Sequence, residues 1–308
     1  MEVSIRSLRY LVAVADAGSV TGAARRLNVS QPSISYAVAN LEADIGFPLF
    51  IRHRARGVSS TPAGARVVAE ARHLLAHVRD FARNARSLGG EPAGDITLGC
   101  FLTVAPRYLP QLLAAFAQRH PAIRVRPEEG DQRQIIDSLM VGRTEVALAY
   151  DFALPEAADA IELAVLPAHV ALPAGHRLAE RERIALAELA EEPFLLLDLP
   201  HSRDYFMSLF RAKGIEPQVR FSSGSQELIR GLVGNGHGFA IQNSIARTPY
   251  ASDGTRLAYV PLDADLAPVR LVLLSLTGLP ARPAVGAFIG FVRDAFAPGG
   301  LFSDPQGT

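Results

Sequence analysis

A stretch of 27 residues that begins at Pro62 constrains the fold of this chain most, because its composition allows one long helix. Between Pro62 and Leu88 there is no further proline, and the only glycine, Gly64, lies in the first turn. A helix of this length extends about 40 Å, which is more than a small domain needs for itself. The stretch therefore predicts a linker between two parts of the chain.

Apolar side chains form a heptad stripe along the predicted linker helix. The stripe, with alternating spacings of four and three, consists of Val67, Ala71, Leu74, Val78, Phe81, Ala85 and Leu88. Such a stripe is typical of helices that pair in a coiled coil. It favours pairing with a second copy of the chain, and packing against the chain's own body is the alternative.

Charge is divided unequally along the chain, although the whole chain is neutral, with 31 Lys and Arg against 31 Asp and Glu. Residues 1–90 hold twelve arginines, no lysine and six acidic residues, whereas residues 91–308 hold 19 basic and 25 acidic residues. The chain therefore has a basic N-terminal part, suited to a polyanion, and an acidic body.

The composition of the 308 residues, with 49% hydrophobic and 20% charged side chains, is that of a globular protein. The single cysteine, Cys100, excludes an intramolecular disulfide framework, and no histidine pair has the spacing of a metal site. The apolar run 11–15 is too short for a secretory signal, and no run reaches the roughly 18 residues of a membrane helix. We expect a cytoplasmic protein with no cofactor, no metal and no membrane partner.

The first sixty residues predict three short helices followed by a two-stranded wing. The helices are expected at about 4–17, 20–27 and 31–45, with Ser19 and Ser30 as N-caps of the second and third. A three-residue turn joins the last two helices, which is the pattern of a helix-turn-helix.

The exposed face of the third helix carries small polar groups, which fit a DNA major groove better than the Lys and Glu of an ordinary solvated face. The wing that follows has a basic tip suited to phosphate groups. The candidate DNA-binding residues are Ser30, Gln31, Pro32, Ser33, Ser35 and Tyr36 on the helix, and Arg52, Arg54 and Arg56 on the wing. The alternative is a capped surface helix beside solvated arginines.

Several motifs follow one another along residues 8–52. They are Leu8-Arg9-Tyr10-Leu11, Gly18-Ser19-Val20-Thr21-Gly22-Ala23-Ala24, Ser30-Gln31-Pro32-Ser33-Ile34-Ser35, Leu41-Glu42, and Gly46-Phe47-Pro48-Leu49-Phe50 with Arg52. In this order they resemble the winged helix-turn-helix of LysR-type transcriptional regulators. The resemblance implies a sequence-specific DNA-binding regulator whose linker helices pair and whose body senses a small-molecule effector. The expected partners are double-stranded promoter DNA with dyad symmetry, the effector, and further copies of the chain in a homodimer or homotetramer.

The acidic body alternates strands and helices in two runs, which predicts two α/β lobes with parallel strands. The first run has strands at 96–101, 123–128 and 146–150 and helices at 105–119 and 132–141. The second has strands at 194–197, 219–222 and 239–241 and helices at 202–213 and 225–234. Extended segments near 163–172 and 259–274 cross between the runs, which suggests a hinged pair with a cleft.

The expected fold class is α+β overall. We expect an N-terminal winged helix-turn-helix (residues 1–61, here called the head), a long linker helix (62–90), and a two-lobed α/β effector domain (91–308) whose layout resembles periplasmic binding proteins. Lobe I covers about 91–165 and 268–308, and lobe II covers about 166–267.

Ligands of such sheets bind beyond the carboxyl ends of the strands. The candidate effector-binding residues at these junctions are Cys100, Phe101, Thr103, Asp131, Asp151, Phe152, His201, Ser202 and Ser223. The family resemblance implies that a hydroxyl at the position of Thr103 contacts the effector, and a helix cap is the alternative. Because Asp131 and Asp151 would repel an anion, we hypothesise an effector with a donor or cationic group. The alternative is that these acids cap helices or face solvent.

The alternatives to a regulator are an enzyme and a cytoplasmic solute-binding protein. His201, Ser202 and Asp204 are sequence neighbours on one helix start, so they do not converge as a nucleophile and base must. Cys100 is expected to be a small buried apolar residue. The basic N-terminal part argues against a free solute-binding protein. We therefore expect a regulator that is not an enzyme.

Overall fold

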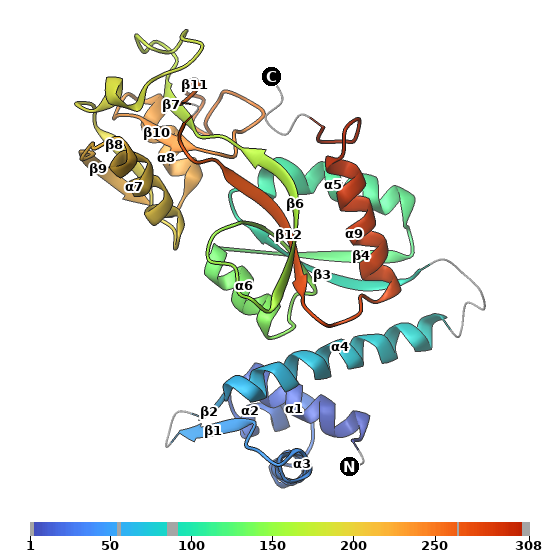
Figure 1. The fold of residues 1–308 in the computed structure, drawn as a ribbon. Coiled ribbons are helices and arrows are strands. Elements are labelled where there is room, and N and C mark those ends of the chain that lie inside the picture. Colours follow the sequence, from blue (N-terminus) through green and yellow to red (C-terminus); the bar gives the residue numbers. More distant parts are fainter. Residues whose placement is uncertain (1–2, 54–56, 85–91, 264, 304–308) are drawn as a thin grey trace.

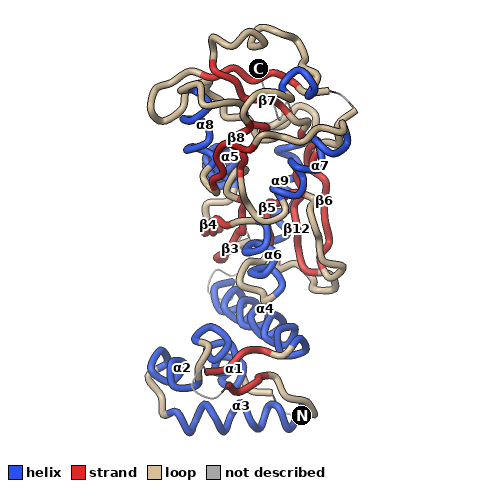
Figure 2. The backbone as a smooth tube through the Cα atoms, turned by 90° about the vertical axis from the view of Figure 1, so that its left-hand side faces the viewer, coloured by secondary structure: helices blue, strands red, loops and turns tan. Residues whose placement is uncertain are grey.

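The computed structural model describes residues 3–53, 57–84, 92–263 and 265–303. The head lies at one end of an elongated molecule, and helix α4 (Pro62–Asn84) lies between the head and the two-lobed body (Figure 1). The view from the side shows the same three levels, with α4 in the middle (Figure 2). No helix within the described ranges is long and apolar enough to span a membrane.

Three helices and a two-stranded antiparallel wing form the head, as the sequence predicts. They are α1 (Ile5–Ala17), α2 (Val20–Leu27), α3 (Gln31–Ile45), β1 (Phe50–His53) and β2 (Gly57–Ser60). The Oγ atoms of Ser19 and Ser30 accept hydrogen bonds from the N–H groups of Gly22 and Ser33, which caps α2 and α3. Asn28 ends α2 in the left-handed conformation, so the short turn of the helix-turn-helix follows at once.

The wing is held against the rest of the head by contacts to its own backbone and to the residue before it. One carboxylate oxygen of Glu42 accepts hydrogen bonds from the N–H groups of Leu49 (2.8 Å) and Phe50 (3.1 Å). The first turn of α4 then approaches this segment closely, because a Cβ at Gly64 would lie 1.9 Å from the carbonyl oxygen of Leu49. Only glycine allows this approach, so α4 starts in a fixed position on the wing.

Helix α4 uses different faces along its length. Val68, Ala71 and Leu75 pack into the core of the head, whereas Leu74 and Phe81 are 49% and 74% exposed. The predicted heptad stripe is therefore partly covered by the chain's own head and partly open to solvent. Ala85 and Leu88, its last two members, lie outside the described residues.

Lobe I contains a five-stranded sheet in the order β4-β3-β5-β12-β6, in which β4, β3 and β5 are parallel. Its strands are β3 (Gly94–Phe101), β4 (Ile123–Gly130), β5 (Val146–Tyr150), β6 (Ala158–Leu166) and β12 (Val269–Leu276), and its helices are α5 (Ala105–Arg119), α6 (Gln132–Met140) and α9 (Pro283–Phe296). Ala147 and Val272 face α6, whereas Leu148 and Leu271 face the core that contains α5 and α9. The sheet is thus covered by helices on both faces. Helix α9 was not predicted from the sequence.

Lobe II contains a parallel pair, β8 (Phe194–Leu197) and β9 (Val219–Ser223), and an antiparallel sheet in the order β10-β7-β11. The remaining elements are β7 (His169–Pro173), β10 (Ala240–Gln242), β11 (Leu257–Pro261), the 3-10 turn Leu186–Leu189, α7 (Ser202–Ala212) and α8 (Gln226–Gly234). A bridge between Phe194 and Phe239 joins the two sheets. The chain crosses between the lobes twice, from β6 to β7 and from β11 to β12.

A buried cluster of charged side chains fastens α4 to lobe I. The guanidinium of Arg282 is 1% exposed, and its Nε and Nη2 donate to the two carboxylate oxygens of Glu145, each at 2.7 Å. Nη2 also donates to the carbonyl of Asp95 (2.9 Å), and Nη1 donates to the carboxylate of Asp80 on α4. Because both Asp80 and Arg282 are buried, each depends on the other for compensation of its charge.

Replacing Asp80 with alanine should lower the free energy of unfolding by about 3–5 kcal/mol, because it leaves the buried guanidinium without one of its two anions. Urea denaturation followed by circular dichroism measures this loss. Glu70→Ala is the matched control, since Glu70 is exposed on the same helix. Equal midpoints for the two variants would show that the cluster does not fasten the helix.

Candidate nucleic-acid interface and interlobe site

The predicted DNA-reading residues lie on the solvent side of α3. Ser30, Gln31, Pro32, Ser33 and Tyr36 are exposed, Tyr36 to 71%, and Ser35 is half-buried. Local hydrogen bonds order this face, because Ser30 Oγ lies 2.6 Å from Ser33 Oγ and Gln31 Nε2 donates to Ser35 Oγ (3.2 Å). Small hydroxyl groups around one projecting aromatic ring leave room for a base edge to approach the helix.

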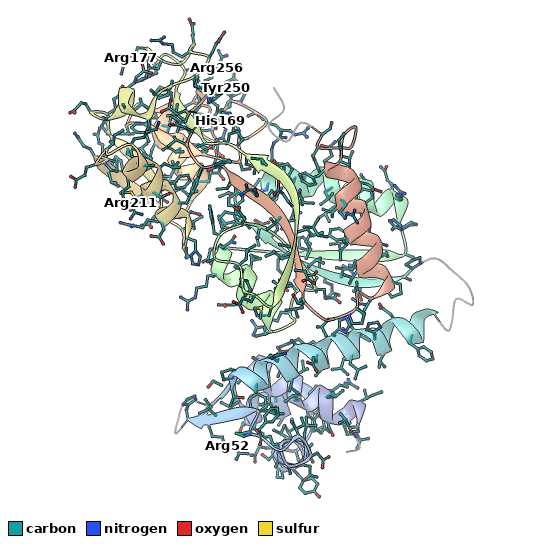
Figure 3. The ribbon with its side chains drawn as sticks, viewed as in Figure 1. Arg52, His169, Arg177, Arg211, Tyr250 and Arg256 are labelled. Atoms are coloured by element: carbon teal, nitrogen blue, oxygen red, sulfur yellow. The ribbon has the colours of Figure 1, made fainter. Side chains whose placement is uncertain are left out.

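The wing continues this surface. Arg52 is exposed on β1 (Figure 3) and makes no ion pair with any described residue. Arg52 and Ser35 line the same small hollow between α3 and the wing, so the helix and the strand are adjacent. Arg54 and Arg56, the other two wing candidates, lie outside the described residues. An unpaired cation beside the helix is placed to meet a phosphate group.

The two lobes meet where the strands of lobe I end. The rings of Phe152 in lobe I and Tyr205 on α7 of lobe II have centroids 5.2 Å apart. Asn243 Nδ2 donates to the carbonyl of Leu166 (3.0 Å) and to the hydroxyl oxygen of Tyr205 (2.9 Å), so a second contact joins the lobes. Burial raises the pKa of Tyr205 to about 12, so this hydroxyl stays protonated at neutral pH.

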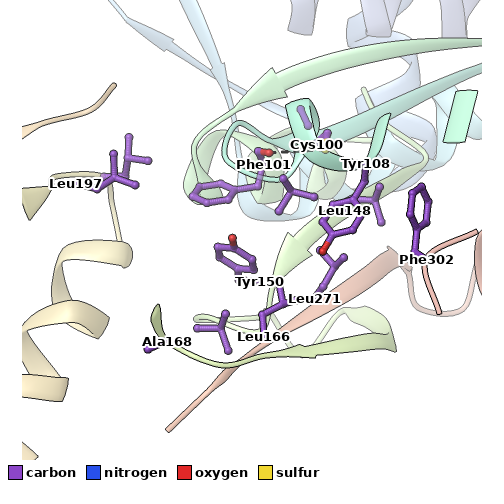
Figure 4. Packing of buried hydrophobic residues seen from close by; sticks show 14 of the residues in the cluster. Cys100, Phe101, Tyr108, Leu148, Tyr150, Leu166, Ala168, Leu197, Leu271 and Phe302 are labelled. Atoms are coloured by element: carbon purple, nitrogen blue, oxygen red, sulfur yellow. Dashed lines mark hydrogen bonds between the residues drawn. The ribbon is translucent and has the colours of Figure 1, made fainter. Parts of the chain in front are cut away.

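Cys100, Phe101 and Thr103 are three of the predicted residues, and all three lie in the buried part of lobe I. The first two end β3, and Thr103 follows it closely. Cys100 and Phe101 are fully buried among apolar side chains, beside the ring of Tyr150 (Figure 4). Burial raises the pKa of the Cys100 thiol, which therefore stays protonated. Thr103 is also buried, and its Oγ1 lies 3.1 Å from the hydroxyl oxygen of Tyr150.

Asp131 and Asp151 already have partners in the structure. Asp131 Oδ1 accepts the N–H of Gln134 (2.9 Å), and Gln134 Oε1 accepts the N–H of Asp131 (3.0 Å), so this acid caps α6 in a reciprocal box. Asp151 accepts the N–H of Arg270 (2.9 Å) and pairs with its guanidinium (3.3 Å). The helix cap is the alternative role that was expected for Asp131, whereas the pairing of Asp151 with Arg270 was not predicted from the sequence.

The edge of lobe II is built from the starts of α7 and α8. His201 precedes α7 with φ +65°, a conformation that costs energy for a residue with a side chain, and Ser202 behind it is buried. Ser223 Oγ accepts the N–H of Ser225 (3.1 Å) at the start of α8. On the side of lobe I, Ala153 also has a positive φ of +46°. Both edges of the interlobe region thus hold strained backbone.

Sequence reasoning missed three polar side chains of this region. Tyr205 packs against Phe152 of lobe I, Asn243 donates to the carbonyl of Leu166 at the end of β6, and Gln132 donates to the carbonyls of Tyr150 (2.7 Å) and Phe152 (3.0 Å). Asn243 follows β10 directly, so the rule that was applied to the other strand ends could have found it. Tyr205 gave no such signal, because its position depends on how α7 faces lobe I.

Two domain models of one family of bacterial regulators match most of the chain. Residues 5–65 match the bacterial regulatory helix-turn-helix protein of the lysR family, and residues 89–297 match the LysR substrate binding domain. The chain is 34% identical over 247 residues to the uncharacterized HTH-type transcriptional regulator YnfL of Escherichia coli K12, covering 78% of this chain and 82% of that protein. It is 30% identical to the dual regulator OxyR of the same organism, covering 80% and 81%.

Solved structures agree with these matches. A LysR family transcriptional regulator from Pseudomonas aeruginosa superposes with a TM-score of 0.64 at 36% identity, covering 96% of this chain and 100% of that one. A full-length OxyR variant from the same organism has a TM-score of 0.71 at 24% identity, covering 95% and 98%, which shows a common fold. The chain therefore belongs to the LysR family of DNA-binding transcriptional regulators, with an N-terminal helix-turn-helix and a C-terminal effector-binding domain.

Proposed function

We propose that two copies of this chain bind a dyad-symmetric operator, with α3 of each copy in the major groove and the wing on the phosphate backbone. The observation that carries the proposal is the exposed, small and polar face of α3 beside the unpaired Arg52. Pairing through the exposed part of α4 would hold two recognition helices at a fixed separation, as two half-sites require. Leu74 and Phe81 supply the apolar surface for this pairing.

The effector is proposed to bind between the lobes, against Thr103, Phe152, His201, Ser202 and Ser223. Strained backbone on both edges and the aromatic contact between the lobes support this location. Cys100, Phe101, Asp131 and Asp151 are also proposed to contact the effector. In the structure their side chains already contact other residues of lobe I. A ligand that binds one arrangement of the lobes better than another would shift the population of DNA-binding conformations.

The response is proposed to be non-covalent binding rather than catalysis or oxidation. Some relatives are named as activators of hydrogen peroxide-inducible genes. Peroxide reacts with accessible thiolates of low pKa, whereas Cys100 is the one cysteine of this sequence, is fully buried and has a raised pKa. These features favour a reversible small-molecule effector.

Variants of α3 and the wing should separate base reading from phosphate binding. Arg52→Ala should weaken binding to all DNA sequences and lower the slope of affinity against salt by about one. Tyr36→Ala or Ser33→Ala should reduce discrimination between operator and mismatched DNA by about 1–3 kcal/mol for each lost base contact. Fluorescence anisotropy titrations over a range of salt concentrations measure both effects. A uniform loss of affinity in all three variants would contradict a base-reading face on α3.

Introducing charge into the exposed stripe of α4 should separate the copies. The double variant Leu74→Glu with Phe81→Glu places like charges in the proposed seam, so we expect a monomer with strongly reduced operator affinity. Leu228→Glu is the matched control, because Leu228 is 54% exposed on α8 of lobe II. Analytical ultracentrifugation measures the mass of each variant. A double variant that keeps the mass of the unchanged protein would refute pairing through α4.

The effector can be sought by thermal shift of the full chain with amines, amino acids and aromatic acids. We expect a ligand with a donor or cationic group to raise the melting temperature, and Thr103→Val to abolish the rise because it removes the hydroxyl but keeps the shape. Thr97→Val is the control, because Thr97 lies within β3, whereas Thr103 follows the carboxyl end of that strand at the lobe junction. The absence of any response to ligands with a donor or cationic group, or a response to such a ligand that persists in Thr103→Val, would count against this site.

A further inference from the structure

A second ligand site is suggested by a cavity of about 530 Å³ between the head, α4 and lobe I. Its walls include Asp16 on α1, Arg26 on α2, Arg72 on α4, Arg126 on β4 and Arg143 after α6. The cavity is lined by residues of the head, α4 and lobe I and by none of lobe II. Helix α4 runs along lobe I, and lobe II lies on the other side of lobe I (Figure 1). Its volume is in the range of small-molecule sites, about 300–1,000 Å³.

The charges around the cavity do not balance. Six arginines line it with three acids, and the acids are engaged: Asp16 pairs with Arg26 (3.3 Å) and Arg72 (2.5 Å), and Glu145 pairs with Arg282. The remaining guanidinium groups, those of Arg79, Arg126 and Arg143, form no ion pair within the described part of the chain. The cavity therefore has an excess of positive charge that an anion would neutralise.

Two buried polar atoms in the cavity wall lack partners. The hydroxyl of Thr144 belongs to a fully buried residue, and neither its Oγ1 nor the Nε of Arg72 has a hydrogen-bond partner among the described residues. A buried polar group without a partner costs stability, so such groups in a native protein point to a missing partner. An anionic oxygen is an acceptor that either donor lacks within the described residues.

The other residues of the cavity wall indicate what the uncharged part of the ligand is like. Leu75, Leu279, Val285 and Ile289 add apolar groups to the cavity wall. His73 also lines the cavity. Burial, followed by the charges of His77 and Arg282, lowers its pKa despite a backbone hydrogen bond at Pro280 that raises it, so the ring is neutral at neutral pH. A small carbon skeleton with two or more anionic groups matches this mixture better than a bare ion.

We propose that this cavity binds a small polyanionic metabolite, either a polycarboxylate or a phosphate-bearing molecule, at a site separate from the interlobe region. Arg126, Arg143 and Arg79 bind its charged groups, and Thr144 and Arg72 donate hydrogen bonds to its oxygens. Because the head, α4 and lobe I each contribute to the wall, the ligand favours the arrangement in which they are docked together. Through this linkage it changes the affinity of the chain for DNA.

Isothermal titration calorimetry of the full chain tests the site with two probes, citrate and pyrophosphate, at a constant ionic strength made up with chloride. Binding of either probe at one site per chain is expected, and the stronger probe distinguishes carboxylate from phosphate chemistry. Arg126→Ala with Arg143→Ala should weaken binding by about tenfold or more, since charge-assisted hydrogen bonds are lost. Both side chains are exposed and unpaired, so this double variant should fold normally.

Three further variants extend the test, and two of them are controls. Thr144→Val should weaken binding and raise the melting temperature of the ligand-free protein, because it removes an unsatisfied buried hydroxyl. Arg124→Ala removes an exposed arginine from the same strand as Arg126 but outside the cavity, and Thr103→Val alters the interlobe region; both should bind like the unchanged protein. The proposal is overturned if neither probe binds, if the double variant binds as tightly as the unchanged protein, or if either control shows an equal loss.

Discussion

The buried guanidinium of Arg282 is the interaction on which the relation between sensor and DNA-binding head depends. It is bonded to Glu145 and the carbonyl of Asp95 in lobe I and to Asp80 on α4, so one side chain joins the linker helix to the effector domain. Removing two carboxylates and a guanidinium from water is costly, and the cost is recovered only in this arrangement. Helix α4 is therefore held to lobe I at a defined position along its length.

The other end of α4 is held just as firmly by a steric constraint. Gly64 approaches the backbone of Leu49 more closely than any side chain would allow, and Val68, Ala71 and Leu75 belong to the core of the head. A rotation of lobe I is thus passed to the head through a helix that is fixed at both ends. The interlobe region and the basic cavity each border lobe I, so a ligand at either proposed site would act on the same connection.

The sequence predicted the parts of the fold whose signals are local. Serine caps and the hydrophobic periodicity located α1, α2 and α3, and the alternation of strands and helices located the elements of both lobes. It did not predict α9 or the pairing of Asp151 with Arg270, and the helix cap at Asp131 was only the alternative to an effector contact. The cavity could not be predicted from the sequence either, because Arg26, Arg126 and Arg143 are far apart in the chain. They come together only when α4 docks on lobe I.

Hydrogen exchange of the full chain and of Arg282→Met tests the central claim most directly, because methionine fills a similar volume without the charge. If Arg282 fastens α4 to lobe I, amides in the second half of α4 should exchange about tenfold or more faster in the variant, while those of α1 keep their protection. Unchanged exchange in the second half of α4 would show that the helix is held to the body by other contacts, and the proposed connection between sensor and head would be wrong.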